Sequence, residues 1–118
     1  MRLYGLLFFV ESLKGGKIMN KIKIFISQPM NGLSKGSILA ERQRIIKTAY
    51  GTYGDNVEIL DTFFDDEKLS PIQCLAKSIS LLATADVAFF AVGWDAYRGC
   101  QIEYKICYEY GIKTHISV

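Results

Sequence analysis

Glu103 is the side chain that the sequence places best for chemistry. A helix is predicted over 99–110, so Glu103 lies near its start, where free backbone N–H groups and the helix dipole stabilise an anion. Gly99 lies one turn earlier on the same face and lets a ligand approach the backbone closely. This pattern fits a nucleophilic carboxylate. It also fits an acidic residue that only favours a helix start, and both interpretations stay open.

The loop after the first predicted strand is a second candidate, with the sequence Ser27-Gln28-Pro29-Met30-Asn31-Gly32. Backbone N–H groups and small polar side chains in such a loop can hold a phosphate or sugar hydroxyls. The segment lacks the GxxxxGK[ST] pattern of the P-loop and the GxGxxG pattern of dinucleotide-binding folds. A plain turn between a strand and a helix explains it equally well.

Further candidates follow the third predicted strand. Trp94 can stack on a nucleobase, with Tyr97 beside it, or it can cap the edge of the core. Arg98 can bind a phosphate or a carboxylate, or it can form a surface ion pair. Both positions therefore keep a functional and a structural interpretation.

The remaining charged residues have simpler explanations. Four acidic side chains lie between the second strand and second helix: Asp61, Asp65, Asp66 and Glu67. They could supply a general acid or bind a cation, but a solvated acidic loop is the simpler interpretation. We place Arg42 and Arg44 on the solvent side of the first helix. The lone His115 fits a core or edge histidine, and the absence of GxSxG argues against a serine hydrolase.

The hydrophobic pattern predicts the scaffold that brings these residues together. Strands are predicted over 21–26, 57–60, 87–92 and 113–118, and helices over 37–53, 71–84 and 99–110. The alternation predicts a single doubly wound α/β domain, flavodoxin-like or Rossmann-like, with about four parallel strands and helices on both faces. Ligands bind such sheets beyond the C-terminal strand ends, where segments 27–36, 61–69 and 93–100 meet. A receiver domain shares this topology but needs an acidic pair where this chain has Ser27 and Gln28.

Composition narrows the class further. The chain has 118 residues, of which half are hydrophobic and 22% are charged, so it fits one globular domain. The net charge of +2, with no Lys/Arg block, argues against strong binding to a nucleic acid polymer. An odd number of cysteines (Cys74, Cys100 and Cys107) and a single histidine argue against a disulfide framework and a zinc site. We expect Cys100 and Cys107, which share a predicted helix, to be buried thiols, and we expect a reducing, cytoplasmic setting.

The first eighteen residues are interpreted separately. The apolar run at 6–10 is too short to span a bilayer, and Glu11 follows it without an A-x-A cleavage site. Lys-Gly-Gly at 14–16 can be encoded by a purine-rich ribosome-binding sequence just before Met19. We therefore expect Met19 to be the true start, and residues 1–18 to be a disordered translated leader. The domain is then 19–118.

Three stretches taken together, KIFISQPMNG, ADVAFFAVGW and RGCQIEYKICYEYGIK, resemble the nucleoside 2-deoxyribosyltransferase superfamily. The nearest likeness is to a branch of small bacterial and phage members. These carry xIFISxPMxG, an Ala-Asp-hydrophobic strand ending in Gly-Trp, and a Gly-Cys-x-x-Glu helix start. The resemblance spans residues 21–116.

The resemblance implies a reaction at Glu103. A glutamate of these enzymes attacks C1′ of a nucleoside or nucleotide and displaces the base, and another base or water resolves the glycosyl-enzyme. The expected function is N-glycosidic cleavage or transfer on a (deoxy)nucleoside or nucleoside monophosphate, without metal or organic cofactor. The implied pocket residues are Ser27 to Gly32, Ser78, Trp94, Arg98 and Gly99. A homodimer or larger assembly is also implied, with Ile106, Tyr108 and Tyr110 as candidate contacts, and no membrane.

Two positions depart from the pattern of the relatives. Tyr97 stands where they usually carry Asp or Ser, and Ser78 stands where they often carry an acid. A serine hydroxyl is a poor general acid. A non-catalytic nucleotide-binding module is therefore the alternative, and the ribosyl bond of a dinucleotide such as NAD is a further substrate alternative.

Overall fold

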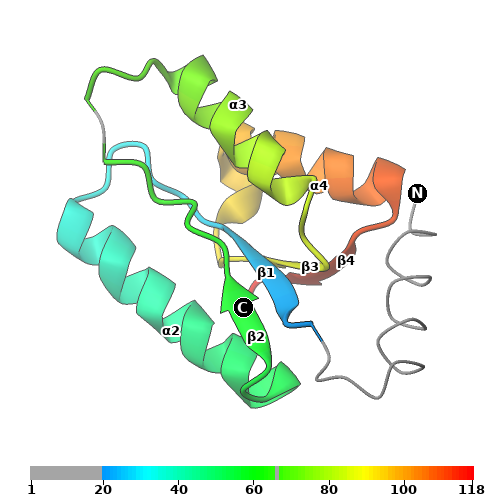
Figure 1. Ribbon diagram of the computed structural model, residues 1–118. Helices are drawn as coiled ribbons and strands as arrows, with labels where there is room; N and C mark the ends of the chain where they lie inside the picture. The colour runs from blue at the N-terminus through cyan, green and yellow to red at the C-terminus, as the bar shows by residue number, and fades with distance from the viewer. Residues whose placement is uncertain (1–19, 66) are drawn as a thin grey trace.

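A computed structural model describes residues 20–65 and 67–118 and has a four-stranded parallel sheet at its centre (Figure 1). The strands are β1 (Ile22–Ser27), β2 (Val57–Ile59), β3 (Val87–Phe90) and β4 (Lys113–Ile116), in the spatial order β2-β1-β3-β4. The predicted doubly wound α/β domain is confirmed. The interpretation of residues 1–18 lies outside the described residues.

Helices cover both faces of the sheet. Helix α2 (Lys35–Tyr53) lies on one face, and α3 (Pro71–Leu82) and α4 (Arg98–Tyr110) lie on the other (Figure 1). The chain moves outward from β1 to β2 and then crosses back over β1 to β3. The strand order therefore reverses between β1 and β3, and open α/β sheets leave a crevice for ligands outside the strand ends at such a point. Ser27 and Phe90, which pair in register, end the two strands there.

The core has two parts, one on each side of the sheet. Along β1, Ile24 and Ile26 pack toward α2, whereas Phe25 packs with the α3 and α4 side. Every residue of β3 is buried, because a parallel strand covered on both faces has no solvent side. This explains the continuous apolar run that predicted the strand.

Local capping signals set most of the helix ends. Ser70 and Gln73 form a capping box before α3, with Pro71 as the first helical residue. Gly111 has a φ of 71° after α4, in the left-handed region that glycine favours. Helix α2 begins at Lys35, two residues earlier than predicted, because the Ser34 hydroxyl caps it by accepting from the backbone N–H of Ser37. A 3-10 turn at 94–96, η1, was not predicted.

The prediction that Arg42 faces solvent is wrong. Its side chain is buried between α2 and the segment after β2, where its guanidinium donates to Thr62 Oγ1 at 2.9 Å and to the Leu60 carbonyl at 2.7 Å. Thr62 in turn donates to the carbonyl of Ile26 at 3.0 Å. Because β2 has only three residues, the carbonyls beyond it have no strand partner, and Arg42 satisfies one of them. Arg44 is exposed, as predicted.

None of the helices in the described part of the chain has the length and apolar character that crossing a membrane requires.

We expect Arg42→Met to lower the free energy of unfolding by about 2 kcal/mol, because it leaves a buried carbonyl and hydroxyl without their charged donor. Urea unfolding followed by circular dichroism measures the loss. Arg44→Met is the matched control on the same helix, and we expect a loss of at most about 0.5 kcal/mol there. Equal losses for the two variants would contradict the structural role of Arg42.

Candidate active site

The carboxylate of Glu103 is held by two serine hydroxyls. Ser27 Oγ donates to Oε1 at 2.6 Å, and Ser78 Oγ donates to Oε2 at 2.7 Å. Glu103 is 7% exposed, and both serines are buried as well. The three side chains come from α4, β1 and α3 and meet beside the C-terminal end of β1. Sequence reasoning had placed all three in one site, and the structure brings them together.

The fold explains why these side chains converge. Ser27 follows the alternation of β1, so its side chain lies on the α3 and α4 face. Ser78 and Leu82 are one turn apart on the buried face of α3. Cys100, Glu103 and Cys107 form the buried stripe of α4 at helical spacing. Each helix thus carries one polar residue on an otherwise apolar face, and the two faces meet over β1.

Burial dominates the electrostatics of Glu103. Burial raises the pKa of this carboxyl above its ordinary value, and the hydrogen bonds from Ser27 and Ser78 act in the opposite direction. Within residues 20–65 and 67–118, no basic side chain forms an ion pair with it. Glu103 lies near the start of α4, as predicted, but in its second turn, because the helix begins at Arg98. Hydroxyl donors, rather than free N–H groups, therefore stabilise the anion.

A thiol lies next to this pair of hydrogen bonds. Cys100 is 5% exposed, as predicted for a buried cysteine. Burial raises the pKa of the Cys100 thiol to about 11, with a smaller increase from the charge of Glu103 and a decrease from hydrogen bonding to Ser27. The thiol is therefore protonated at neutral pH. The three-residue spacing of Cys100 and Glu103 places both on the buried face of α4.

The start of α4 is accessible from outside. Gly99 is half-buried, and a Cβ added there meets no neighbouring atom within 4 Å. Arg98 is exposed at the first helical position. Trp94 is half-buried, with its ring centroid 4.6 Å from that of Tyr104 and 5.5 Å from that of Phe90. This placement corresponds to the core-capping interpretation of Trp94, with part of the indole still exposed.

The side chains of Ser27, which ends β1, and of Gln28, which follows it, point to opposite faces of the sheet. Ser27 points toward Glu103, but Gln28 points toward α2, where its Nε2 donates to the carbonyl of Ile38 at 3.0 Å. Gln28 Oε1 is buried without a hydrogen-bond partner among the described residues. Pro29 lies close to Gly93, and the backbone of Met30 accepts from Leu33 across a turn that contains Asn31 and Gly32. The side chain of Gln28 therefore does not line the Glu103 site.

The acidic loop does not reach Glu103 through the side chains described. Asp65 forms an ion pair with Lys35 that joins the loop after β2 to the start of α2, and Asp61 accepts from the backbone of Phe63 at 3.3 Å. Asp66 lies outside the described residues. No group of three or more His, Cys, Asp or Glu in the described ranges could hold a metal ion. His115 stacks on Phe89 at the β4 edge, in agreement with an edge histidine.

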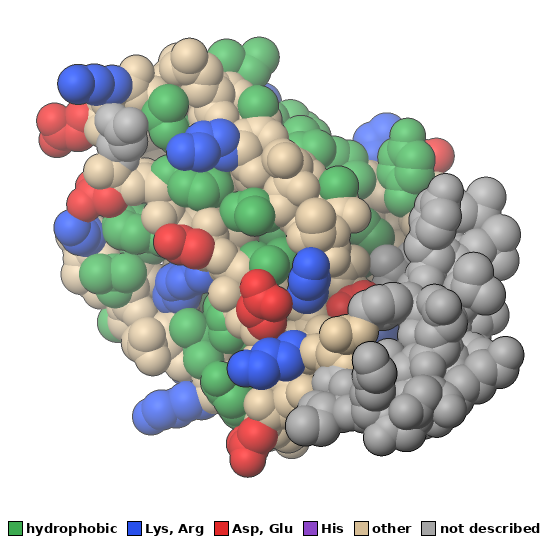
Figure 2. Space-filling model, viewed as in Figure 1, with side chains coloured by type: hydrophobic (Ala, Val, Ile, Leu, Met, Phe, Trp, Pro, Cys, Tyr) green, Lys and Arg blue, Asp and Glu red, His purple; other side chains and the backbone are tan. Residues whose placement is uncertain are grey.

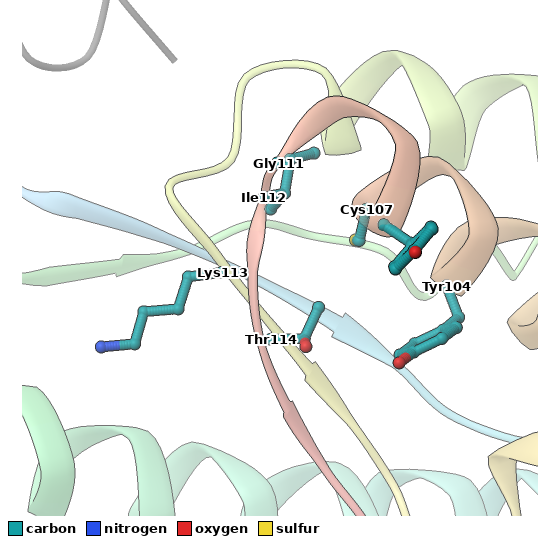
Figure 3. A pocket seen from close by; sticks show the side chains of 7 residues that line it. Tyr104, Cys107, Gly111, Ile112, Lys113 and Thr114 are labelled. Atoms are coloured by element: carbon teal, nitrogen blue, oxygen red, sulfur yellow. The ribbon is translucent and has the colours of Figure 1, made fainter. Parts of the chain in front are cut away.

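A separate shallow depression of about 340 Å³ lies between α4 and β4 (Figure 3). Tyr104 and Cys107 line it from the helix, and Lys113 and Thr114 line it from the strand. Lys113 begins β4, so this hollow lies toward the N-terminal strand ends, away from the edge where ligands bind parallel sheets. Its lining residues include no carboxylate. We therefore place the candidate active site at Glu103 and not in this depression.

The molecular surface is mixed in charge. Figure 2 shows basic and acidic side chains interspersed on the face drawn there, in keeping with the net charge of +2. Hydrophobic side chains also gather on this face between α2 and α3 (Figure 2). Of the candidate contact residues, Tyr108 and Tyr110 are exposed on α4, whereas Ile106 packs partly against the core.

We expect Glu103→Gln to raise the melting temperature near neutral pH. Because the folded pKa of Glu103 is raised, the folded state binds this proton more tightly than the unfolded chain does. That contribution to stability is complete below the ordinary value of 4.5 and is lost as the pH rises through the folded pKa. The glutamine cannot ionise, so its advantage should shrink in acid. Thermal unfolding at several pH values measures this difference.

Glu109→Gln is the matched control, since Glu109 lies on the same helix with an exposed side chain. We expect only a small and nearly pH-independent change there. A melting-temperature difference for Glu103→Gln that grows toward acid would show that burial does not raise this pKa.

Comparisons with known proteins do not identify the site, so its geometry is the evidence for its role. No protein-family model matches the chain, no curated protein matches it, and no solved structure matches it.

Proposed function

We propose that the protein breaks or transfers the N-glycosidic bond of a (deoxy)nucleoside or nucleoside monophosphate, with Glu103 as the nucleophile. The observation that carries this proposal is the buried Glu103 carboxylate, whose two oxygens are oriented by hydroxyls from β1 and α3. The resemblance of the surrounding motifs to the deoxyribosyltransferase superfamily supports it. So does the place of Glu103 beside the switch point between β1 and β3.

The chemistry follows from a desolvated and oriented anion. One carboxylate oxygen of Glu103 attacks C1′ while the C1′–N bond breaks, and the base departs with the bonding electrons and takes up a proton from water. The products of this step are a glycosyl ester and free base. Water or a second base then attacks C1′, and the carboxylate is released. Each oxygen accepts one serine hydrogen bond and keeps a further lone pair, so Ser27 and Ser78 orient the group without blocking it.

The substrate in this proposal lies over the start of α4. The open space at Gly99 is on the same helix face as Glu103 and suits the sugar. Exposed Arg98 suits a 5′-phosphate, and the exposed part of Trp94 suits the base. Because the nucleophile must be ionised, we expect the rate to rise with pH through the raised pKa of Glu103.

Base release is the direct test. Purified protein is incubated with deoxynucleosides and their monophosphates, with and without a second free base, and the products are separated by chromatography. We expect free base or an exchanged nucleoside from the wild type, and a rate at least about a thousandfold lower from Glu103→Gln. Similar rates for the two proteins would exclude Glu103 as the nucleophile.

A pair of glycine variants tests where the substrate lies. Gly99 and Gly36 are each the second residue of a helix, and a Cβ at either position meets open space. We expect Gly99→Val to keep the melting temperature and to lower kcat/KM by about tenfold, because its side chain fills the space beside Glu103. Gly36→Val is the control with the same chemical change, and it should leave both unchanged. Equal effects of Gly99→Val and Gly36→Val on kcat/KM would show that the substrate does not occupy the space at Gly99.

A non-catalytic nucleotide-binding module is the second candidate. The observation that favours it is the hydrogen bond that the Ser78 hydroxyl donates to the Glu103 carboxylate. Members of the deoxyribosyltransferase superfamily often carry an acid at the position of Ser78. This candidate predicts that a nucleoside or nucleotide raises the melting temperature without any base release. The incubations described above, repeated with a thermal-shift readout, separate the two candidates.

A further inference from the structure

The Glu103 carboxylate is a buried negative charge without a positive partner in the described part of the chain. It is 7% exposed, and none of the ion pairs found there includes it. Its two hydrogen bonds come from the neutral hydroxyls of Ser27 and Ser78, at 2.6 Å and 2.7 Å. The buried guanidinium of Arg42 belongs to α2, on the other side of the sheet (Figure 1). A buried charge is costly unless an opposite charge accompanies it, so this carboxylate favours a ligand that brings a positive charge.

The site also offers little that could protonate a departing base. A neutral purine or pyrimidine leaves C1′ with the bonding electron pair and needs a proton as it departs. The single hydroxyl hydrogens of Ser27 and Ser78 are both donated to Glu103, and no second carboxyl group among the described residues hydrogen-bonds to these three. Burial raises the pKa of the Cys100 thiol to about 11, so this group holds its proton too tightly to act as the acid. A base that leaves without a proton therefore suits this site best.

We propose that the Glu103 site binds a cationic N-glycoside, in which the ring bonded to C1′ carries a positive charge, as in an N7-alkylated purine nucleoside or a pyridinium nucleoside. The inference rests on the proposed function, because it assigns the ligand of the same carboxylate. Such a ligand carries its positive charge in the ring next to C1′, the atom that Glu103 attacks. The buried anion and the ligand then neutralise each other, which a site of low dielectric favours.

The reaction of this substrate class transfers no proton to the base. One oxygen of Glu103 bonds to C1′, the C1′–N bond breaks, and its electron pair cancels the positive charge of the ring. The anion and the cation thus become a neutral glycosyl ester and a neutral base. Water then attacks C1′, the Glu103 carboxylate leaves as the anion, and the released proton of the water passes to the solvent. The two steps use the carboxylate and water alone.

Trp94 supplies the second feature that suits a cation. Its indole is half-buried, with its ring centroid 4.6 Å from that of Tyr104 and 5.5 Å from that of Phe90. Phe90 pairs in register with Ser27, so this aromatic cluster lies at the same strand ends as the hydrogen bonds of Glu103. The face of an indole attracts a cation more strongly than a neutral ring. A positively charged base is therefore stabilised both by the carboxylate and by the exposed part of the indole.

Binding without turnover tests the charge of the ligand. The probes are 7,9-dimethylguanine, a cation in mildly acidic buffer, and neutral 9-methylguanine. In both, the methyl group on N9 stands in place of C1′, so neither can be cleaved. We expect the cation to bind the wild type at least about tenfold more tightly than the neutral probe, and the two to bind Glu103→Gln equally. Glu109→Gln, the same change at an exposed position of α4, should keep the wild-type preference. Titration followed by NMR measures these affinities.

Turnover tests the need for a proton. Base release from 7-methylguanosine and guanosine, and from their deoxy and monophosphate forms, is divided by the spontaneous rate in the same buffer, which removes the intrinsic weakness of the methylated bond. We expect the acceleration to be larger for the methylated nucleoside, by about tenfold or more. Trp94→Leu should reduce this difference, and Trp94→Phe should keep most of it. Tyr108→Leu is the control for loss of an exposed ring on α4.

The outcomes separate this inference from the proposed function. Equal binding of the two probes to the wild type, or a preference that survives in Glu103→Gln, overturns the cationic ligand. A greater acceleration for guanosine than for 7-methylguanosine also overturns it, while base release that depends on Glu103 leaves the proposed function standing. A preference for the cation that depends on Glu103, in a protein that releases base from no nucleoside, supports the cationic ligand and counts against the proposed function.

Discussion

The central strands of a parallel sheet expose neither face to water, and most of this structure follows from that constraint. Every residue of β3 and the last four residues of β1 are buried, and helices cover these strands on both sides. The helices can cover both sides only if the chain winds outward to β2 and then back across β1. This reversal leaves the ends of β1 and β3 side by side with no crossover above them. The same winding that builds the core therefore creates the place where a polar group can reach a ligand.

Glu103 is buried beside the ends of these strands, and this burial lowers the stability of the folded state. A carboxylate removed from water loses several kcal/mol of solvation unless charges or dipoles replace it. Here two neutral hydroxyls replace part of it, and the raised pKa of Glu103 shows that the replacement is incomplete. An arginine or lysine partner would stabilise the anion more, but it would also reduce its nucleophilicity. The absence of a cationic partner among the described residues suits the nucleophilic role proposed for Glu103.

The sequence predicted the elements better than the contacts between them. Capping residues such as Ser70 and Gly111 are local signals, and they defined the helix ends within a few residues. Arg42 was misplaced because its charge suggested solvent, whereas the short strand β2 leaves carbonyls that only a long donor can reach. The hydrogen bond between Ser78 and Glu103 depends on how α3 crosses α4, and no local pattern encodes that crossing.

The three members of the carboxylate site are far apart in the chain. Ser27 and Glu103 are separated by 76 positions, and Ser78 and Glu103 by 25. Contacts between residues so far apart carry a loop-closure cost, which the rest of the folded structure must offset. A nascent or partly unfolded chain lacks the enclosure that makes this glutamate differ from any other surface acid. The chemistry proposed for Glu103 therefore depends on contacts that only the folded chain provides, and local opening of α3 would remove one of the two hydroxyl donors to its carboxylate.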